Sequence, residues 1–282
     1  MKKQGIKKYE LRSRIITTIV VALIGMIFVL PLIWMISASL LTDAQVYEYP
    51  FQWLPAAPRW QNYREIYTSS IVSLPRMYLN SLTIAVASIA GVLLISALAA
   101  YAFACISFPG KNIVFALFIG VMMIPTQVTI IPRFLLFKTI GIYNTLWSVI
   151  LPSFFSVTSI FLMRQFFMSL PVSLRESAFL DGAGHLRILM QIVFPLAKPT
   201  IASLIIINFI TSWNDYFSPL IFLINNKMFT VSLGIRYYHT LEIPSTHLTM
   251  AMSVCAIMPI LIVFFSCQRF FIESIATSGV KG

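Results

Sequence analysis

The stretch LNSLTIAVASIAGVLLISALAAYAFA, residues 79–104, contains no charged side chain and decides the fold class. It lies within a longer charge-free run between Arg76 and Lys111, which exceeds the ~20 residues that an α-helix needs to cross a hydrocarbon core. The segment Val92–Ala104 shows none of the period-two alternation of a transmembrane β-strand. Because backbone groups find no water partner in lipid, the stretch predicts a membrane-spanning helix.

The composition of the whole chain also indicates a membrane environment. Of its 282 residues, 59% are hydrophobic and only 10% are charged, and the mean hydropathy is +0.87. Soluble domains carry about 25% charged residues, so a water-soluble fold of this composition would expose large apolar patches. The formal net charge of +11 does not indicate nucleic-acid binding, because the basic residues flank apolar runs instead of gathering on one polar face.

Further apolar runs of similar length follow from the spacing of the charged residues. We therefore predict an all-α integral membrane protein with six transmembrane helices, at residues 15–40, 79–104, 113–132, 146–167, 200–222 and 248–268. The expected segments are a cytoplasmic N-terminus (1–14), the first span (15–40), an external loop (41–78), a transmembrane core with spans two to six (79–272) that includes a cytoplasmic loop (168–199), and a cytoplasmic tail (273–282).

The basic residues predict the orientation of these spans. The first apolar run is about twice as long as the ~7–15-residue apolar region of a cleavable signal peptide, so we expect it to be a retained helix. With both termini in the cytoplasm, thirteen of the 20 Lys and Arg residues fall on the cytoplasmic side and seven on the outside. This excess follows the positive-inside rule.

No group of residues predicts an enzyme or a metal site. The chain lacks the GxxxxGK[ST] phosphate loop, so it is not expected to be an ATPase itself. Its three histidines form no HExxH pattern and have no cysteine partner at metal-binding spacing. The three cysteines lie in apolar helices or at their ends, where a thiol acts as a small hydrophobic group.

The predicted cytoplasmic loop between the fourth and fifth spans is longer than a simple connection requires. Leu170-Pro171 ends the preceding helix, and the capping-box spacing of Ser173 and Glu176 predicts that a new helix begins there. Gly182 and Gly184 supply the positive-φ stop that helices commonly use. The resulting helix of about nine residues is too short to span a membrane and would lie at its cytoplasmic face.

The same loop resembles the EAA loop of binding-protein-dependent ABC importer permeases. Residues 176–183 read ESAFLDGA, with Ser177 where the family has its first Ala. After Gly182, residues 192–195 read IVFP at the family's spacing, with Phe194 in place of Leu.

Other segments are similar to the carbohydrate-uptake branch of these permeases, above all to the second permease of maltose and glycerol-phosphate importers. The likeness covers nearly the whole chain from Asn80 onward. The segments that carry it are Asn80–Leu82, Leu98–Phe103, Phe108–Lys111, Ile124–Gln127, Arg164–Phe167, Trp213–Asp215 and Gly279–Gly282.

This resemblance implies a type I ABC importer permease fold and a role in importing a mono- or oligosaccharide through the cytoplasmic membrane of a prokaryote. The chain would be a transporter subunit, not an enzyme, and would bind no cofactor and no nucleic acid. Its implied partners are a sister permease, membrane lipid, two ATPase subunits or domains that hold ATP and Mg²⁺, and an extracellular solute-binding protein.

In such an importer the short loop helix would be the coupling helix, seated on one ATPase. The residues implied in this contact are Glu176, Ser177, Ala178, Asp181, Gly182 and Ala183. The residues alone leave a second interpretation of Glu176 open, in which its carboxylate only caps its own helix.

Asp215 interrupts the fifth apolar run, where a charged side chain at a helix centre costs about 2.5–3.5 kcal/mol. One interpretation is a polar lining of a translocation cavity, shared with Asn208, Trp213 and Asn214. The other is a hydrogen bond that holds a helix break before Pro219.

The predicted external loop at about residues 225–247 mixes polar and apolar side chains. The resemblance implies that part of it reaches into the binding protein and helps to release the sugar, through Leu233, Gly234, Ile235, Tyr237 and Tyr238. The alternative is a plug that folds on its own subunit.

Functions of other classes were weighed against this one. An ABC permease for a non-sugar solute, such as an amino acid, a polyamine or a phosphate ester, differs from a sugar permease only in the features of the carbohydrate branch. An ion-coupled secondary transporter would need intramembrane carboxylates on more than one helix, and Asp215 is the one clear candidate. The sugar itself is not predicted, because a separate binding protein would select it.

Overall fold

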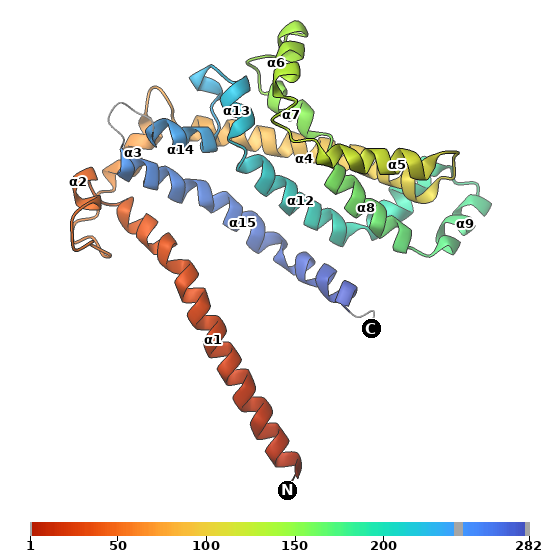
Figure 1. Cartoon of the computed structure of the whole chain (residues 1–282), viewed down its shortest axis with the longest axis horizontal. Helices are drawn as coiled ribbons and strands as arrows, with labels where there is room; N and C mark the ends of the chain where they lie inside the picture. The colour runs from red at the N-terminus through yellow and green to blue at the C-terminus, as the bar shows by residue number, and fades with distance from the viewer. Residues whose placement is uncertain (1, 240–244, 280–282) are drawn as a thin grey trace. The chain divides into compact units, whose positions relative to one another are not determined.

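The computed structural model describes residues 2–239 and 245–279, and within these ranges the regular structure is entirely helical (Figure 1). The chain forms two compact units. The first unit combines residues 1–68 with 235–255, and the second combines 69–234 with 256–282. The expected all-α membrane fold is therefore confirmed.

The first unit begins with a long apolar helix, α1 (Lys2–Ala38). Its stretch Arg14–Ala38 is long and apolar enough to cross a membrane, and its side chains are exposed over most of that length. From Arg14 onward, the buried part of α1 is its C-terminal end, where Ala38 packs with Leu41 and Val46. This helix corresponds to the predicted first span at 15–40.

The segment after α1 is folded back by hydrogen bonds and contains α2 (Asp43–Val46) and α3 (Gln61–Thr68). The buried Asn62 amide donates to the carbonyl oxygens of Ser39 and Leu41, both at 2.9 Å. The predicted external loop is thus an ordered cap on the end of α1.

A second link in this unit joins α2 to the start of α15 (Thr246–Gly279). The imidazole Nδ1 of His247 lies 2.9 Å from Oδ1 of Asp43. Burial by itself would raise the pKa of Asp43, but the hydrogen bonds and charge of His247 outweigh it, so this pKa lies below its ordinary value.

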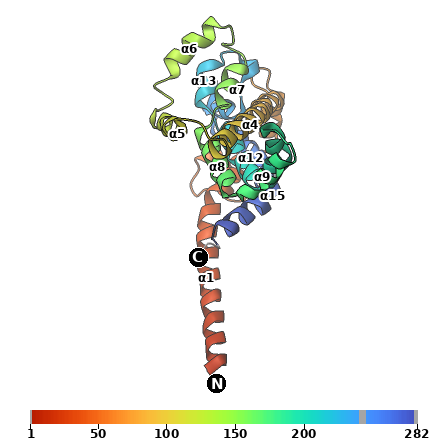
Figure 2. The same ribbon diagram turned by 90° about the vertical axis from the view of Figure 1, so that its right-hand side faces the viewer.

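The second unit is built around α4 (Leu74–Cys105), which packs against α8 (Val157–Ser169) and α12 (Lys198–Trp213). Figures 1 and 2 both show these two helices alongside α4. The helix begins before the predicted residue 79 because Pro75 occupies its first turn, where the missing N–H costs nothing. The predicted second span is therefore confirmed with a longer N-terminal end.

The predicted third span at 113–132 is wrong as a continuous helix. The structure has α5 (Lys111–Gly120), a 3₁₀ turn η1 (Val121–Met123) and a separate helix α6 (Ile130–Thr139). Ile124 is extended, with φ −83° and ψ 113°, because the following Pro125 disfavours the α conformation. Apolar composition alone did not reveal this interruption.

Two other predicted spans also contain breaks. The region 146–167 divides into α7 (Trp147–Ser153) and α8, and the region 200–222 divides into α12 and α13 (Phe217–Phe222). In the second case Pro219 cannot donate a hydrogen bond to the Asp215 carbonyl and its ring would clash with that carbonyl, so a continuous helix through both segments is disfavoured.

The structure supports the predicted all-α membrane fold but does not itself show a count of six spans. Within the described residues, four helical stretches are long and apolar enough to cross a membrane, and a fifth results if one bent pair counts as a span. That pair joins His185–Leu196 to Lys198–Trp213 with a bend of 80°.

The predicted cytoplasmic loop contains α9 (Val172–Leu180), α10 (His185–Ile188), the π-helix η2 (Leu189–Val193) and α11 (Phe194–Leu196). Helix α9 begins before Ser173, with Pro171 at its N-cap position and no side-chain cap, so the predicted capping box is not formed. Gly182 follows α9 with φ +76°, as the predicted stop requires, but the same prediction is wrong for Gly184, whose φ is −74°. The remaining elements are η3 (Asn226–Met228) and α14 (Val231–His239).

Candidate functional site

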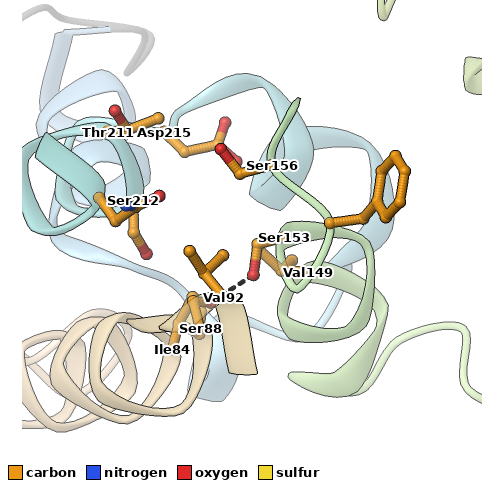
Figure 3. Close-up of a pocket in the computed structure, with 11 residues that line it drawn as sticks. Ile84, Ser88, Val92, Val149, Ser153, Ser156, Thr211, Ser212 and Asp215 are labelled. Carbon is orange, nitrogen blue, oxygen red and sulfur yellow. Dashed lines mark hydrogen bonds between the residues drawn. The ribbon is translucent and has the colours of Figure 1, made fainter. Parts of the chain in front are cut away.

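A hollow of about 360 Å³ with both apolar and polar lining residues lies within the second unit. Its walls come from α4, from α7 and the break that follows it, and from the C-terminal end of α12 (Figure 3). The polar residues among its lining are Ser88, Ser153, Ser156, Asn208, Thr211, Ser212 and Asp215. A cavity with this many hydroxyl groups between apolar helices can bind a polar solute, because each hydroxyl can both donate and accept.

Two of the residues predicted to line a cavity do so. The Asn208 amide donates to the Leu204 carbonyl at 2.8 Å and to the Ser159 hydroxyl at 3.1 Å, which leaves its oxygen as an acceptor. Oδ1 of Asp215 accepts the backbone N–H of Ser218 at 3.0 Å, at the start of α13. Asp215 thus lines this hollow and also holds the helix break, while its part in a translocation path stays a prediction.

The neighbouring Trp213 and Asn214 are placed differently and are not among the lining residues. Trp213 is buried, and its indole N–H donates to the Ala256 carbonyl at 2.9 Å. Its ring stacks on Phe209 with a centroid distance of 5.4 Å. Asn214 is the exposed C-cap residue of α12. Trp213 therefore belongs to the packed core, and Asn214 lies at the end of the helix.

The hydroxyl side chains of the cavity were missed by the sequence analysis. Ser153 and Ser88 form a hydrogen bond of 2.6 Å across the cavity wall, between α7 and α4. The hydroxyl of Ser212 is buried and has no hydrogen-bond partner in the described chain. Ser88 was visible in the sequence as one of the small residues of the second span, but that pattern equally predicts close helix packing.

The predicted coupling residues lie on α9 and at its C-terminal end. Glu176, Ser177 and Asp181 are exposed, and the Ser177 hydroxyl donates to the Ser173 carbonyl within the helix. Ala178 is the buried residue of this helix. Ala183 closes the turn after Gly182 through its N–H, which donates to the Ala178 carbonyl at 2.9 Å.

Helix α9 is anchored to the same core as the long helices. Ala178 packs in one cluster with residues of α4 and α8, including Tyr101, Met163 and Phe167. Its outer side is uncovered and mixed in character, since Leu180 is 89% exposed beside the exposed Glu176 and Ser177. A movement imposed on the outer side would therefore reach the helical core directly.

A polar link reinforces this anchor. The Tyr101 hydroxyl on α4 lies 3.2 Å from Nδ1 of His185, at the start of α10. The His185 ring also contacts Phe179 edge to face, with a centroid distance of 4.9 Å. The loop that contains α9 is thus joined to α4 by packing and by a hydrogen bond.

The residues predicted to contact a binding protein lie on α14, a helix rather than an open loop. Leu233 and Tyr238 are 4% and 5% exposed, and Gly234 is also buried. Ile235 and Tyr237 are half-buried. The N-terminal end of α14 is held to its own subunit by the Ser81 hydroxyl, which accepts the Val231 N–H at 2.9 Å. Residues 240–244 of the predicted loop lie outside the described part of the chain.

Together these features define an all-helical membrane transport subunit, with a polar cavity among its helices and a short exposed helix in its long loop. The sequence profile described as "Binding-protein-dependent transport system inner membrane component" matches residues 93–276. The chain belongs to this family. It is accordingly the inner-membrane permease component of a binding-protein-dependent transport system, and not an enzyme.

Curated relatives agree with this assignment. The chain is 33% identical over 266 residues to the sn-glycerol-3-phosphate transport system permease protein UgpE of Yersinia pestis bv. Antiqua (strain Antiqua), covering 92% of this chain and 95% of that protein. It is 32% identical over 263 residues to UgpE of Brucella abortus (strain 2308), covering 90% and 93%.

A solved structure shares the fold. It belongs to a bacterial ABC transporter involved in the import of the acidic polysaccharide alginate, and matches with a TM-score of 0.80 and 22% identity. The match covers 91% of this chain and 95% of that one.

Proposed function

We propose that this chain is a permease subunit of an ATP-driven importer that moves a sugar through the cytoplasmic membrane by alternating access. The observation that carries the proposal is the two-sided character of α9. Its Ala178 is buried with residues of α4 and α8, whereas Leu180 is 89% exposed. A large exposed apolar side chain beside polar neighbours is typical of a docking surface.

The proposed occupant of this surface is an ATPase subunit that binds ATP and Mg²⁺. Glu176, Ser177 and Asp181 would make polar contacts around the apolar centre. Gly182 and Ala183 would fix the end of the helix through the left-handed turn. Closure of two ATPase subunits would shift α9, and the shift would change the access of the cavity between two states.

The proposed path for the solute includes the cavity lined by Asn208 and Asp215. A sister permease would supply the other wall, and both termini of this chain would lie in the cytoplasm, as the distribution of basic residues favours. A hydroxyl-rich lining suits a sugar, whose hydroxyls need partners that both donate and accept.

An extracellular solute-binding protein would deliver the sugar to this path. On α14 the half-buried Ile235 and Tyr237 are the proposed contacts, since Leu233, Gly234 and Tyr238 are occupied in packing. This arrangement supports a combined role, in which α14 is seated on its own subunit and presents a limited surface to the binding protein.

The docking of α9 is tested by Leu180→Ser in the complete importer. Loss of an exposed apolar contact should reduce co-purification of the ATPase and stimulation of ATP hydrolysis by loaded binding protein, while membrane insertion persists. Leu54→Ser is a matched control, because Leu54 is 90% exposed on the predicted external side. Equal behaviour of the two variants would contradict the coupling role.

The solute is identified by a thermal-shift screen of the co-purifying binding protein against mono- and oligosaccharides, because a bound ligand raises the apparent stability. One alternative has specific support. Two relatives are named for sn-glycerol-3-phosphate, so a permease for a phosphate ester is the second candidate.

A further inference from the structure

The charge of the cavity distinguishes between these two solute classes. Among the described residues that line it, Asp215 is acidic and none is Lys, Arg or His. Proteins that bind phosphate or carboxylate groups ordinarily present Arg, Lys or a cluster of backbone N–H groups to them. This wall of the cavity offers a carboxylate instead.

The position of Asp215 keeps that carboxylate in the cavity. The residue is half-buried at the end of α12, and the Ser218 N–H binds its Oδ1 at 3.0 Å. This bond fixes the side chain beside Thr211, one helical turn earlier, and both residues line the same hollow (Figure 3). A carboxylate oxygen only accepts hydrogen bonds when ionised, so Asp215 suits a solute hydroxyl that donates.

The rest of the lining also fits an uncharged solute. The Asn208 NH₂ group donates to the Leu204 carbonyl and to the Ser159 hydroxyl, so Asn208 offers its side-chain oxygen to a solute as an acceptor. The Thr211 hydroxyl donates to the Ile207 carbonyl at 2.8 Å, which leaves its oxygen lone pairs as acceptors. The Ser212 hydroxyl is buried without a partner in the described chain, so it is not counted among the groups that face the solute. Asn208 and Thr211 thus present acceptors, whereas the Ser88 and Ser156 hydroxyls accept hydrogen bonds within the chain and keep a proton to donate. A polyol can pair with both kinds of group, because each of its hydroxyls donates and accepts.

We propose that Asp215 is a specificity-determining residue that makes this wall of the cavity favour uncharged polyhydroxylated solutes and repel anionic ones. The inference rests on the proposed function, because it takes this cavity to be part of the solute path. It separates the chain from the relatives and the fold neighbour named above, whose names specify a phosphate ester and an acidic polysaccharide. Like charges repel more strongly in a site of reduced dielectric than in water, so an ionised Asp215 disfavours an anion at this wall.

The local charge can be measured without knowing the solute. In the purified complete importer, Thr211→Cys is modified by an anionic methanethiosulfonate, the sulfonatoethyl reagent, and by a cationic one, the trimethylammonioethyl reagent. The rate of each reagent with the protein is divided by the rate of the same reagent with a free thiol in solution, which removes the difference in intrinsic reactivity. Because both reagents attack the same thiolate, their ratio cancels any effect of Asp215 on thiol ionisation. Protein with Thr211 intact gives the background from the three native cysteines.

The cationic reagent should be favoured by a factor on the order of ten, and Asp215→Asn should bring the corrected ratio close to one. Asparagine retains the acceptor for Ser218, so the helix break should persist. Glu65→Gln removes a charge from exposed α3 and should leave the ratio unchanged. Ser156→Cys, on another wall of the cavity, replaces Thr211→Cys if that variant does not assemble. A ratio that Asp215→Asn does not alter overturns the proposal.

A transport measurement separates this inference from the proposed function. Proteoliposomes with the wild-type importer and its binding protein should not accumulate sn-glycerol-3-phosphate. Accumulation of this anion would overturn the selectivity while leaving the importer function intact. Failure of the chain to assemble with a sister permease and ATPase would instead refute the proposed function.

Discussion

Gly91 allows α4 to pass the break between α7 and α8 at close range. A Cβ atom at this position would lie inside van der Waals contact of the Phe154 ring. Helices in lipid gain no hydrophobic free energy from association, so close packing of small residues supplies much of their attraction. The same approach brings Ser88 to Ser153, whose hydrogen bond is part of the cavity wall.

Gly91→Ala should therefore destabilise the second unit, by about 1–3 kcal/mol if the core relaxes as overpacked cores commonly do. The measurement is the thermal unfolding midpoint of the purified complex. Gly120→Ala is the matched control, because nothing lies within 4 Å of an added Cβ there and the helical backbone favours Ala. A Gly91→Ala complex as stable as this control would show that the contact is not limiting.

For single residues, the sequence indicated which polar residue types matter in the fifth apolar run better than it indicated where each side chain lies. Asn208 and Asp215 were predicted as cavity residues and line the cavity. Trp213 was predicted with them but is buried against Phe209, because it follows Asn208 by five residues and so lies about 140° around α12, on another face. Single hydroxyl groups such as Ser156 carried no signal, since a serine in an apolar run predicts close packing as readily as a cavity.

At the scale of elements, charge-free runs identified where helices occur but not where they break. The predicted spans at 15–40, 79–104 and 248–268 each correspond to one long helix. The region 113–132 does not, because Pro125 holds the preceding residue extended. A hydropathy average over many residues hides a single proline, whereas that proline alone can interrupt the helical backbone.

The end of α9 permits a sharp test at this scale. Gly182 has φ +76° and its N–H donates to the Phe179 carbonyl at 3.0 Å. Gly182→Pro cannot adopt this φ and lacks the donor, so the C-terminal turn of α9 should be rebuilt. We expect normal membrane insertion but reduced ATPase association and reduced ligand-stimulated hydrolysis.

Gly184→Ala provides the comparison for this variant. Gly184 has φ −74°, which any residue adopts, and nothing lies within 4 Å of an added Cβ. This neighbour in the same loop should keep normal association. Normal transport by Gly182→Pro would show that the geometry of the α9 end is not needed for coupling.

At the scale of the whole molecule, the subunit has surfaces that a single copy in water cannot satisfy. Helix α1 exposes apolar side chains over most of Arg14–Ala38, and α9 exposes Leu180. Lipid can cover the first of these, and the proposed ATPase subunit would cover the second. The sequence predicted such partners only through family resemblance, because composition describes one chain and carries no information on a second.

Expression without the sister permease and ATPase should therefore yield an unstable or misassembled subunit. The polar cavity would then lack its proposed second wall, and unpaired polar groups facing lipid are costly. Size-exclusion profiles of the subunit expressed alone and with its partners give the comparison. A stable monomer that transports sugar unaided would contradict the heteromeric assembly.

Variants of α14 can show whether this helix contacts the binding protein or only packs against its own subunit. Leu233 is 4% exposed, so Leu233→Ala should cost about 2–5 kcal/mol and lower the unfolding midpoint of the complex. Tyr237 is half-buried and lies 5.6 Å from the Tyr238 ring, so Tyr237→Ala should remove less packing. If α14 also contacts the binding protein, Tyr237→Ala should raise several-fold the concentration of loaded binding protein that half-stimulates ATP hydrolysis. Leu233→Ala should change chiefly stability. If both variants alter stability alone, α14 is a structural plug and its role in solute release should be abandoned.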